Sequence, residues 1–381
     1  MGRPKAVSGR LLVALLAAAT LAARAQERPA SDRIAFVKMW ELSGWERPYG
    51  DIVVPLLDGR RLVINDLDTL RLVDIEDANA STVWKIAAGP LLPAPGGDAL
   101  WLGTAKGLRR LDLKTGKETS PWRAQAIDVS FLRVARDGKR ALTADYVSQN
   151  AATARVWDLS TGKSRVLADE SLHEGRPVTS DFVLYAAALS RDGRRAVTGG
   201  RDAKLRIWDA GTGRLITVSK FPASIMCLDF SPDDRSLVVG DAKGQIALVD
   251  LASGKTSARW KGHDSPTSAV AYSPDGAHIL SGGGDKLLKL WDAATHKELE
   301  SWGGHDGTMP RSVAFLPGGR LAVTSGGGEV KTITRVKVWD IAAILAGTRG
   351  APKLIPAAAR PEPGPAQTES ADDAKPVQLL R

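Results

Sequence analysis

The sequence predicts an all-β fold built from seven copies of a unit with four short strands. Each copy is too small to bury its own apolar faces, so the copies must stack on one another. A Gly-rich or Asp-Gly turn, which joins antiparallel strands tightly, recurs near Asp58, Gly96, Asp137, Asp192, Asp233, Asp275 and Gly318. An Asp closes each unit, at steps of about 40 to 50 residues, at Asp74, Asp112, Asp158, Asp209, Asp250, Asp292 and Asp340.

The most complete unit contains all the motifs that the other units keep in part. It reads Gly262-His263, then Ser273-Pro274-Asp275-Gly276, then Trp291-Asp292. These three motifs, in this order and at this period, resemble the WD-repeat β-propeller family over about residues 33–346. The resemblance implies a seven-bladed β-propeller of four-stranded antiparallel blades, closed radially so that only short edges are exposed.

In that family, four side chains of a repeat form a hydrogen-bonded tetrad. The resemblance assigns these roles to His263, Ser281, Asp285 and Trp291. A buried indole N–H needs an acceptor, and His and Ser can relay such a bond to a turn carboxylate. The other repeats keep only parts of the set. We interpret the Trp residues that precede a closing Asp as core residues, namely Trp157, Trp208, Trp291 and Trp339.

The ends of the chain are expected to lie outside the propeller, which spans 26–346. Basic residues precede an apolar run at 11–23, and Ala23-Arg24-Ala25 is a small-x-small cleavage pattern, so residues 1–25 are predicted to be a signal peptide. The run is shorter than the about 20 residues that cross a bilayer. We expect export to the periplasm or outside, with no transmembrane segment after cleavage; an uncleaved anchor is the alternative. The Pro- and Ala-rich tail, 347–381, is expected to be disordered.

An N-terminal strand is expected to close the ring. Residues 34–40 read as a strand before the first complete repeat, and residues 341–345 after the last closing Asp look helical. In the family, such a strand often supplies the outer strand of the last blade. We therefore expect it to pair with the third strand of that blade, at residues 336–339.

Composition and charge argue against a nucleic-acid-binding protein and against a reactive thiol. The chain has 381 residues and a net charge of +9, of which +5 remains without the four basic residues of the predicted signal peptide. The basic residues are scattered along the chain, whereas nucleic-acid binding needs them clustered. Cys227, the single cysteine, lies in a predicted strand, where we interpret it as a buried apolar residue.

The resemblance places the longest connections on one face of the ring. In the family, connections between the second and third strands, and between successive blades, share a face. Insertions on one face of a repeat array are the usual place for binding, and Trp, Tyr and Arg are enriched in interfaces. The candidate partner-binding residues are therefore Trp45, Arg47, Tyr49, Tyr146, Gln149, Asn150, Arg176, Met309 and Arg311.

An enzyme is the competing class, as is a protein that binds a small molecule or a glycan in the central channel. Asp229 is the only acid in the four first strands that are clearest in sequence, and none of them contains His. No nucleophile with its base, no metal-ligand set and no cofactor motif is visible. We therefore expect a non-catalytic scaffold of the cell envelope or periplasm that binds a protein or peptide, with no cofactor, metal or nucleic acid.

Overall fold

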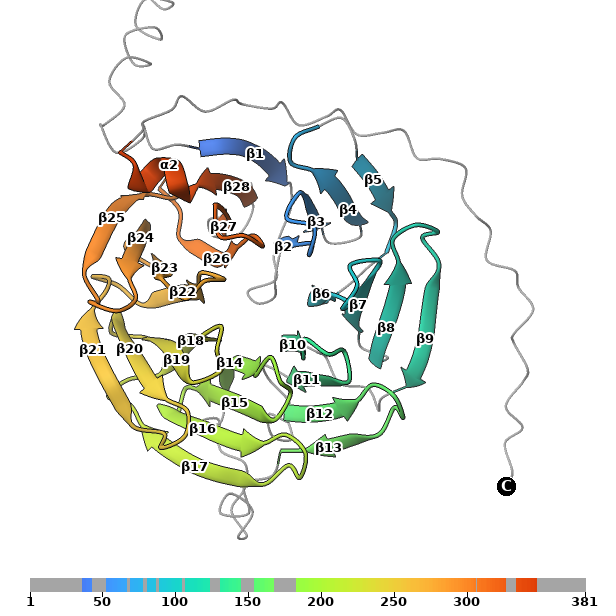
Figure 1. Ribbon diagram of the computed structural model, residues 1–381, viewed down its shortest axis with the longest axis horizontal. Coiled ribbons are helices and arrows are strands. Elements are labelled where there is room, and N and C mark those ends of the chain that lie inside the picture. Colours follow the sequence, from blue (N-terminus) through green and yellow to red (C-terminus); the bar gives the residue numbers. More distant parts are fainter. Residues whose placement is uncertain are drawn as a thin grey trace, which may run out of the picture.

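The computed structural model describes residues 36–42, 53–66, 69–77, 81–86, 89–104, 107–123, 131–144, 154–167, 183–305, 307–326 and 334–347. Its strands form seven four-stranded antiparallel sheets, arranged as a ring with the first strand of each sheet nearest the axis (Figure 1). The predicted seven-bladed β-propeller is confirmed. The expected signal peptide and most of the expected tail lie outside the described residues.

The strands follow one another from the axis outward in blades 1 to 6. Blades 1 and 2 comprise β2 (Val53–Pro55), β3 (Arg61–Asp66), β4 (Thr69–Asp74), β5 (Ser81–Trp84), β6 (Leu91–Pro93), β7 (Ala99–Thr104), β8 (Gly107–Asp112) and β9 (Glu118–Arg123). Blades 3 and 4 comprise β10 (Phe131–Val134), β11 (Arg140–Ala144), β12 (Ala154–Asp158), β13 (Ser164–Val166), β14 (Leu184–Leu189), β15 (Arg195–Gly200), β16 (Lys204–Asp209) and β17 (Leu215–Lys220).

Blades 5 and 6 comprise β18 (Ile225–Phe230), β19 (Ser236–Asp241), β20 (Gln245–Asp250), β21 (Thr256–Lys261), β22 (Thr267–Tyr272), β23 (His278–Gly283), β24 (Leu287–Asp292) and β25 (Glu298–Gly303). Blade 7 comprises β26 (Pro310–Phe315), β27 (Leu321–Gly326), β28 (Thr334–Asp340) and, as its outer strand, β1 (Phe36–Leu42). A short helix, α2 (Ile341–Leu345), follows the last closing Asp.

The recurring Asp residues hold the turns between strands. In the turn from β22 to β23, Asp275 accepts hydrogen bonds from Ser273 Oγ at 2.5 Å and from the N–H of Ala277 at 3.0 Å. The closing Asp292 accepts bonds from the N–H and the Oγ1 of Thr295, both at 2.7 Å. These donors favour the ionised carboxylate and lower the pKa of Asp292. The Asp residues that recur along the sequence are therefore the residues that cap the turns.

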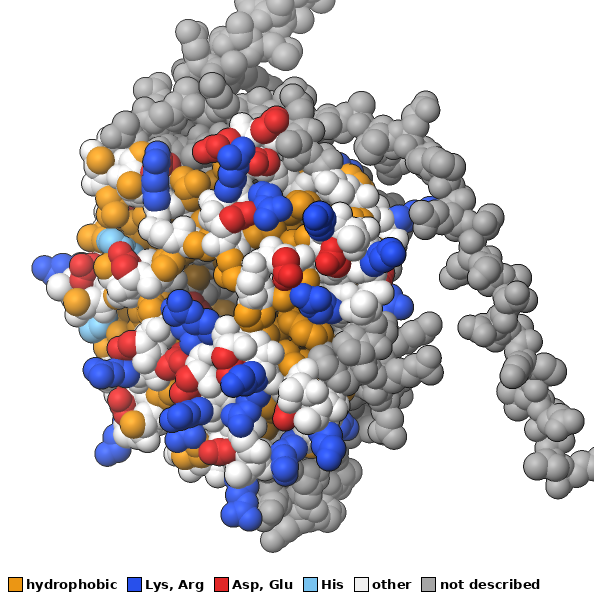
Figure 2. Space-filling view, turned by 45° about the vertical axis from the view of Figure 1, so that its right-hand side comes forward, with side chains coloured by type: hydrophobic (Ala, Val, Ile, Leu, Met, Phe, Trp, Pro, Cys, Tyr) orange, Lys and Arg blue, Asp and Glu red, His pale blue; other side chains and the backbone are white. Residues whose placement is uncertain are grey.

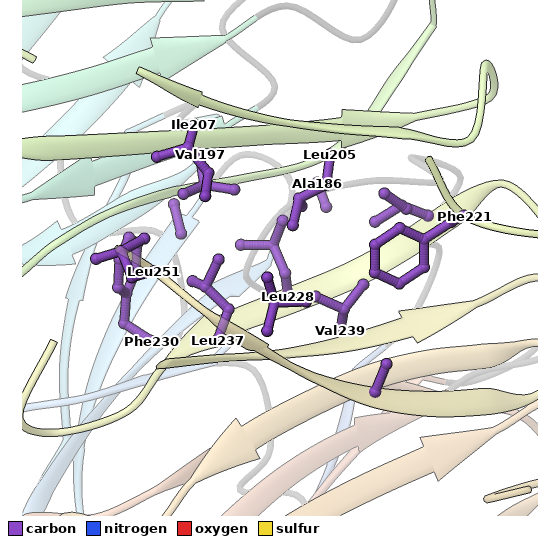
Figure 3. Packing of buried hydrophobic residues seen from close by; sticks show 14 residues of the cluster. Ala186, Val197, Leu205, Ile207, Phe221, Leu228, Phe230, Leu237, Val239 and Leu251 are labelled. Carbon is purple, nitrogen blue, oxygen red and sulfur yellow. The ribbon is translucent and has the colours of Figure 1, made fainter. Parts of the chain in front are cut away.

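The core lies between blades rather than within them. Seven clusters of buried apolar residues exist among the described residues, and each one joins two neighbouring blades. Between blades 4 and 5, Val197 and Ile207 pack against Leu228 and Val239 (Figure 3). This arrangement explains why one repeat cannot fold alone: half of each core belongs to the neighbour.

The ring is closed by the N-terminal strand, as predicted. Strand β1 pairs antiparallel with β28, with Met39 opposite Lys337 and Trp40 opposite Val336, and it lies beside β28 in Figure 1. The strand begins and ends two residues later than the expected 34–40. A core cluster that joins Val53 of blade 1 to Val323 of blade 7 completes the closure.

Candidate functional site

The two faces of the ring differ in the length of their connections. We call the side with the first-to-second and third-to-fourth connections the turn face; every first-to-second turn contains five residues. We call the opposite side the loop face; its second-to-third and blade-to-blade connections range from two to seventeen residues. The longest of these joins β13 to β14. Variation in length is therefore concentrated on the loop face.

The tetrad of blade 6 lies just beneath the loop face. Trp291 Nε1 donates to Ser281 Oγ at 2.8 Å, and Ser281 Oγ lies 2.8 Å from His263 Nε2. His263 Nδ1 lies 3.0 Å from Asp285 Oδ1. A relay follows in which the Ser hydroxyl donates to Nε2 and the Nδ1–H donates to the carboxylate. Burial lowers the pKa of His263, which keeps the imidazole neutral, as this relay requires.

A glycine makes the tetrad possible. A Cβ on Gly283 would overlap His263 Nδ1 and Asp285 Oδ1. Only Gly allows the backbone of β23 to pass so close to the imidazole. The glycine at position 283 of this repeat is therefore explained by packing around His263.

The order Ser281–His263–Asp285 matches the hydrogen-bond order of a hydrolytic triad. Its surroundings do not suit that chemistry. Ser281 has 0% of its surface exposed and His263 has 1%, and Ser281 Oγ already accepts the indole N–H of Trp291. A nucleophile must be reached by a substrate carbonyl. This constellation therefore works as a structural relay.

The Trp-to-hydroxyl bond is more widespread than the complete tetrad. It occurs in blade 4 between Trp208 and Thr198 at 2.9 Å, and in blade 7 between Trp339 and Thr324 at 2.8 Å. In blade 3, Trp157 donates to Thr143 at 2.8 Å. The sequence analysis missed Thr143 because the insertion after β11 obscures its spacing from Trp157. All four Trp residues are at most 4% exposed, as predicted.

Blade 5 lacks the Trp and His, and a different residue caps its turn. Asp241, 1% exposed, accepts hydrogen bonds from the N–H groups of Lys243 at 2.8 Å and Gln245 at 3.0 Å. Asp285 makes the corresponding bond with the N–H of Leu287 in blade 6. When blades 5 and 6 are aligned, Asp241 lies two positions before the position equivalent to Asp285. Its carboxylate nevertheless caps the same turn.

Asp229, the acid noted among the first strands, joins blades 5 and 6. Its Oδ2 accepts the N–H of Tyr272 on β22 at 2.9 Å, and its Oδ1 accepts the N–H of Phe230 at 2.9 Å. Burial raises the pKa of Asp229 to about 6, and these bonds together with Arg133 and Arg191 oppose that rise. Both oxygens are occupied by backbone donors, so Asp229 has a role in holding adjacent inner strands together.

The raised pKa of Asp229 makes a prediction about stability. Its folded pKa of about 6 lies above the ordinary value of 3.8, so its contribution to stability is lost as pH rises from about 4 to 6 and stays lost above that range. Two pKa units correspond to about 3 kcal/mol. Asn cannot titrate, so only the wild type should lose this stability. Between about pH 4 and pH 6, we expect the free energy of unfolding of the wild type to fall by about 3 kcal/mol relative to that of Asp229→Asn. Urea unfolding at both pH values measures it; a constant difference would contradict the prediction.

The structure describes only two of the nine candidate partner-binding residues. Met309 and Arg311 lie at the loop-face end of blade 7, before and within β26, and both are half-buried. The other candidates lie outside the described residues: Trp45, Arg47, Tyr49, Tyr146, Gln149, Asn150 and Arg176. The connections that contain those seven residues all leave described strands at the loop face.

The described residues contain neither a metal-ligand cluster nor a helix that could span a membrane. No group of three or more His, Cys, Asp and Glu side chains in the described ranges could hold a metal ion. No described helix has the length and apolar character needed to cross a bilayer, and α2 has five residues. Cys227 lies in β18, half-buried, and burial raises the pKa of its thiol.

Two family models match the sequence. The model described as "WD domain, G-beta repeat" matches residues 254–292, which contain the outer strand of blade 5 and three inner strands of blade 6. The sequence repeat is thus offset by one strand from the blade. The model described as "Outer membrane protein assembly factor BamB" matches residues 37–261, from β1 to the end of blade 5 and more than half of the chain.

Several curated proteins are similar over part of the chain. The "Meiotic recombination protein rec14" of Schizosaccharomyces pombe is 27% identical over 121 residues, which cover 31% of this chain and 37% of that protein. The "Pre-rRNA-processing protein crb3/ipi3" of the same yeast is 28% identical over 173 residues, 43% of this chain and 38% of that protein. The human "Angio-associated migratory cell protein" is 28% identical over 191 residues, which cover 45% of this chain and 42% of that protein. The chain spans about two fifths of the length of these relatives.

Proposed function

Because this chain belongs to the WD-repeat β-propeller family, we propose that it is a non-catalytic scaffold that binds a protein partner on its loop face, in the cell envelope or periplasm. The observation that carries the proposal is the contrast between the two faces. The turn face repeats the same five-residue first-to-second turn in every blade, whereas the loop face varies from two to seventeen residues. Insertions on one face of a repeat array are where binding surfaces are built.

The chemistry of the described side chains supports a binding role without catalysis. The relay through His263 and Ser281 is buried and ends on Trp291. The carboxylate of Asp229 accepts two backbone N–H groups. Both of these constellations among the described residues are therefore already used to hold strands and blades together.

Two observations support a location in the envelope. The N-terminal sequence has the basic, apolar and small-x-small order of a signal peptide. The family model that matches residues 37–261 is described by a role in outer-membrane protein assembly. Fractionation of cells that express the tagged full chain tests the location: recovery with cytoplasmic markers would contradict it.

Affinity capture from an envelope extract tests the binding face. The bait is the tagged protein from Gln26 onward, and a second bait carries Trp45→Ala, Tyr146→Ala, Arg176→Ala and Arg311→Ala. We expect a protein that the first bait captures and the second bait loses. Circular dichroism must show that both baits are folded.

A third bait provides the matched control, with four alanine substitutions on the turn face: Leu57→Ala, Arg194→Ala, Arg235→Ala and Lys255→Ala. We expect this bait to keep the partner. If instead the turn-face bait loses the partner and the loop-face bait keeps it, the proposed face is wrong. If no bait captures a protein, the scaffold role is wrong and a small-molecule screen of the channel follows.

A further inference from the structure

The loop face of blades 4 to 6 carries a set of basic side chains that lie far apart in the sequence. The second-to-third turns contribute Arg201 in blade 4, Lys243 in blade 5 and Lys286 in blade 6, and Lys204 follows the turn of blade 4 as the first residue of β16. The outer strands of blades 4 and 5 end at this face in Lys220 and Lys261. We call these six residues the basic arc: Arg201, Lys204, Lys220, Lys243, Lys261 and Lys286.

Acidic residues at the same face are turned inward. Asp241 is 1% exposed, and Asp285 is held by His263 at 3.0 Å. Asp202 forms an ion pair with the buried Arg206 at 2.7 Å. Among the described residues in the loop-face connections of these three blades, Asp264 is the one exposed acid. The described part of this surface is therefore mainly cationic.

The basic arc contains like charges that the fold itself does not neutralise. Lys204 and Lys220 lie directly opposite each other on β16 and β17, an arrangement that disfavours the folded state. Among the described residues, only Lys261 of the six takes part in an ion pair, with Asp264 at 4.0 Å. Lys286 occupies a left-handed conformation, φ 71°, at the turn position where blade 4 has Ala203, φ 57°, and blade 5 has Gly244, φ 75°.

The turn face of the same blades is balanced. Residues 190–195, 209–214, 231–235, 250–255, 273–277 and 292–297 contain seven Arg or Lys and seven Asp. Arg195 lies 3.4 Å from Asp209, and Arg194 and Arg235 each lie 3.9 Å from an Asp of their own turn. Figure 2 shows Lys and Arg interspersed with Asp and Glu over the face that it presents. Among the described residues of these blades, the excess of positive charge is thus specific to the loop face.

We propose that the basic arc is the docking surface for an acidic, Asp- and Glu-rich segment of the partner protein. The inference rests on the proposed scaffold function and adds the chemistry of the partner. Opposite charge across an interface steers association and sets the register of the partner. The lysines supply separate point charges with rotatable donors, which suit carboxylates spaced along an extended segment.

A protein segment fits the basic arc better than a nucleic acid does. Nucleic-acid surfaces combine clustered cations with aromatic side chains on which bases stack. The described loop-face connections of these blades contain, besides His263 and His305, one aromatic side chain, Phe221, and all three of these side chains are buried. Five of the six cations are lysines, which cannot form the bidentate Arg pairs that read phosphates or bases.

The test uses a fluorescent peptide of alternating Glu and Ser as the probe, with a Gln and Ser peptide as its neutral match. Anisotropy titrations compare the protein from Gln26 onward with the variant Lys220→Glu, Lys243→Glu and Lys286→Glu. We expect the acidic peptide alone to bind, and the variant to bind it roughly tenfold more weakly or worse. Raising the salt from about 0.05 to 0.2 M should weaken wild-type binding as well.

The matched control reverses the same number of charges in the same three blades on the turn face: Arg214→Glu, Lys255→Glu and Lys297→Glu. We expect it to bind the acidic peptide within about twofold of wild type. If both triple variants lose binding equally, only net charge matters and the proposed surface is wrong. If wild type binds the neutral peptide as tightly, or binds oligothymidylate more tightly than the acidic peptide, the acidic-protein assignment is wrong.

The same triple variants in envelope capture separate this proposal from the scaffold function. A partner that is captured by wild type and by the turn-face variant, but lost by the basic-arc variant, supports both. A partner that survives reversal of the basic arc, yet is lost by the four alanine substitutions described above, leaves the scaffold function standing and overturns the basic arc. Capture of nothing by wild type overturns the scaffold function itself.

Discussion

Replacing Trp291 with Ala is expected to lower the free energy of unfolding by about 3–5 kcal/mol. The side chain is 3% exposed and packs between blades 5 and 6, where it forms a T-shaped pair with Trp260 at a centroid distance of 5.8 Å. Its loss leaves a cavity at a blade interface and removes the N–H that Ser281 accepts. Equilibrium unfolding in urea, followed by circular dichroism, measures the change.

A pair of Phe substitutions separates packing from hydrogen bonding. Trp291→Phe keeps most of the apolar surface and loses the bond to Ser281. Trp302→Phe removes a comparable volume from a side chain that is 1% exposed and whose Nε1 has no partner among the described residues. We expect Trp291→Phe to cost about 1 kcal/mol more than Trp302→Phe. Equal costs would mean that the tetrad adds no stability beyond packing.

Deleting the closing strand is expected to have an effect at least as large. Strand β1 makes six register pairs with β28, which correspond to about six ladder hydrogen bonds at roughly 1 kcal/mol each. Without β1, the edge of β28 is also open to pairing with other chains. We expect protein that begins after Leu42 to be less stable by on the order of 6 kcal/mol and prone to aggregate. Thermal unfolding and light scattering measure both.

A chain that begins at residue 36 is the control, because it lacks the same upstream residues and keeps β1. It should unfold as the protein from Gln26 does. A synthetic peptide of residues 34–42, added to the shortened chain, should restore thermal stability in a concentration-dependent way. If the chain that begins after Leu42 is as stable as the control without peptide, closure by β1 contributes little and the core between blades 7 and 1 is sufficient.

The fold was predictable because its signal is repeated. Asp275 and Asp292 each cap a turn through short-range hydrogen bonds, so their spacing reports strand length directly. The closing strand was predicted only to within two residues, since the register of β1 depends on its pairing with β28 and not on its own sequence. Local chemistry is visible in sequence, whereas register across the ring is not.

The candidate site was predictable only in part. The tetrad of blade 6 follows from spacing, yet the cap of blade 5 does not, because Asp241 reaches the turn from a different position. The basic arc was missed for a similar reason. Lys220, Lys243 and Lys286 are far apart in sequence, and only the stacking of blades brings their turns to one face.

The pairing of β1 with β28 also governs the order in which the molecule can be completed. The first described strand of the chain is paired with the last described one, so its partner does not exist until nearly the whole described chain has been made. Contacts of such long sequence separation form late, because loop closure costs entropy before the contact is gained. Blades can therefore assemble one on another as they emerge, while the ring stays an open arc. The ring closes in one last step, when β1 pairs with β28.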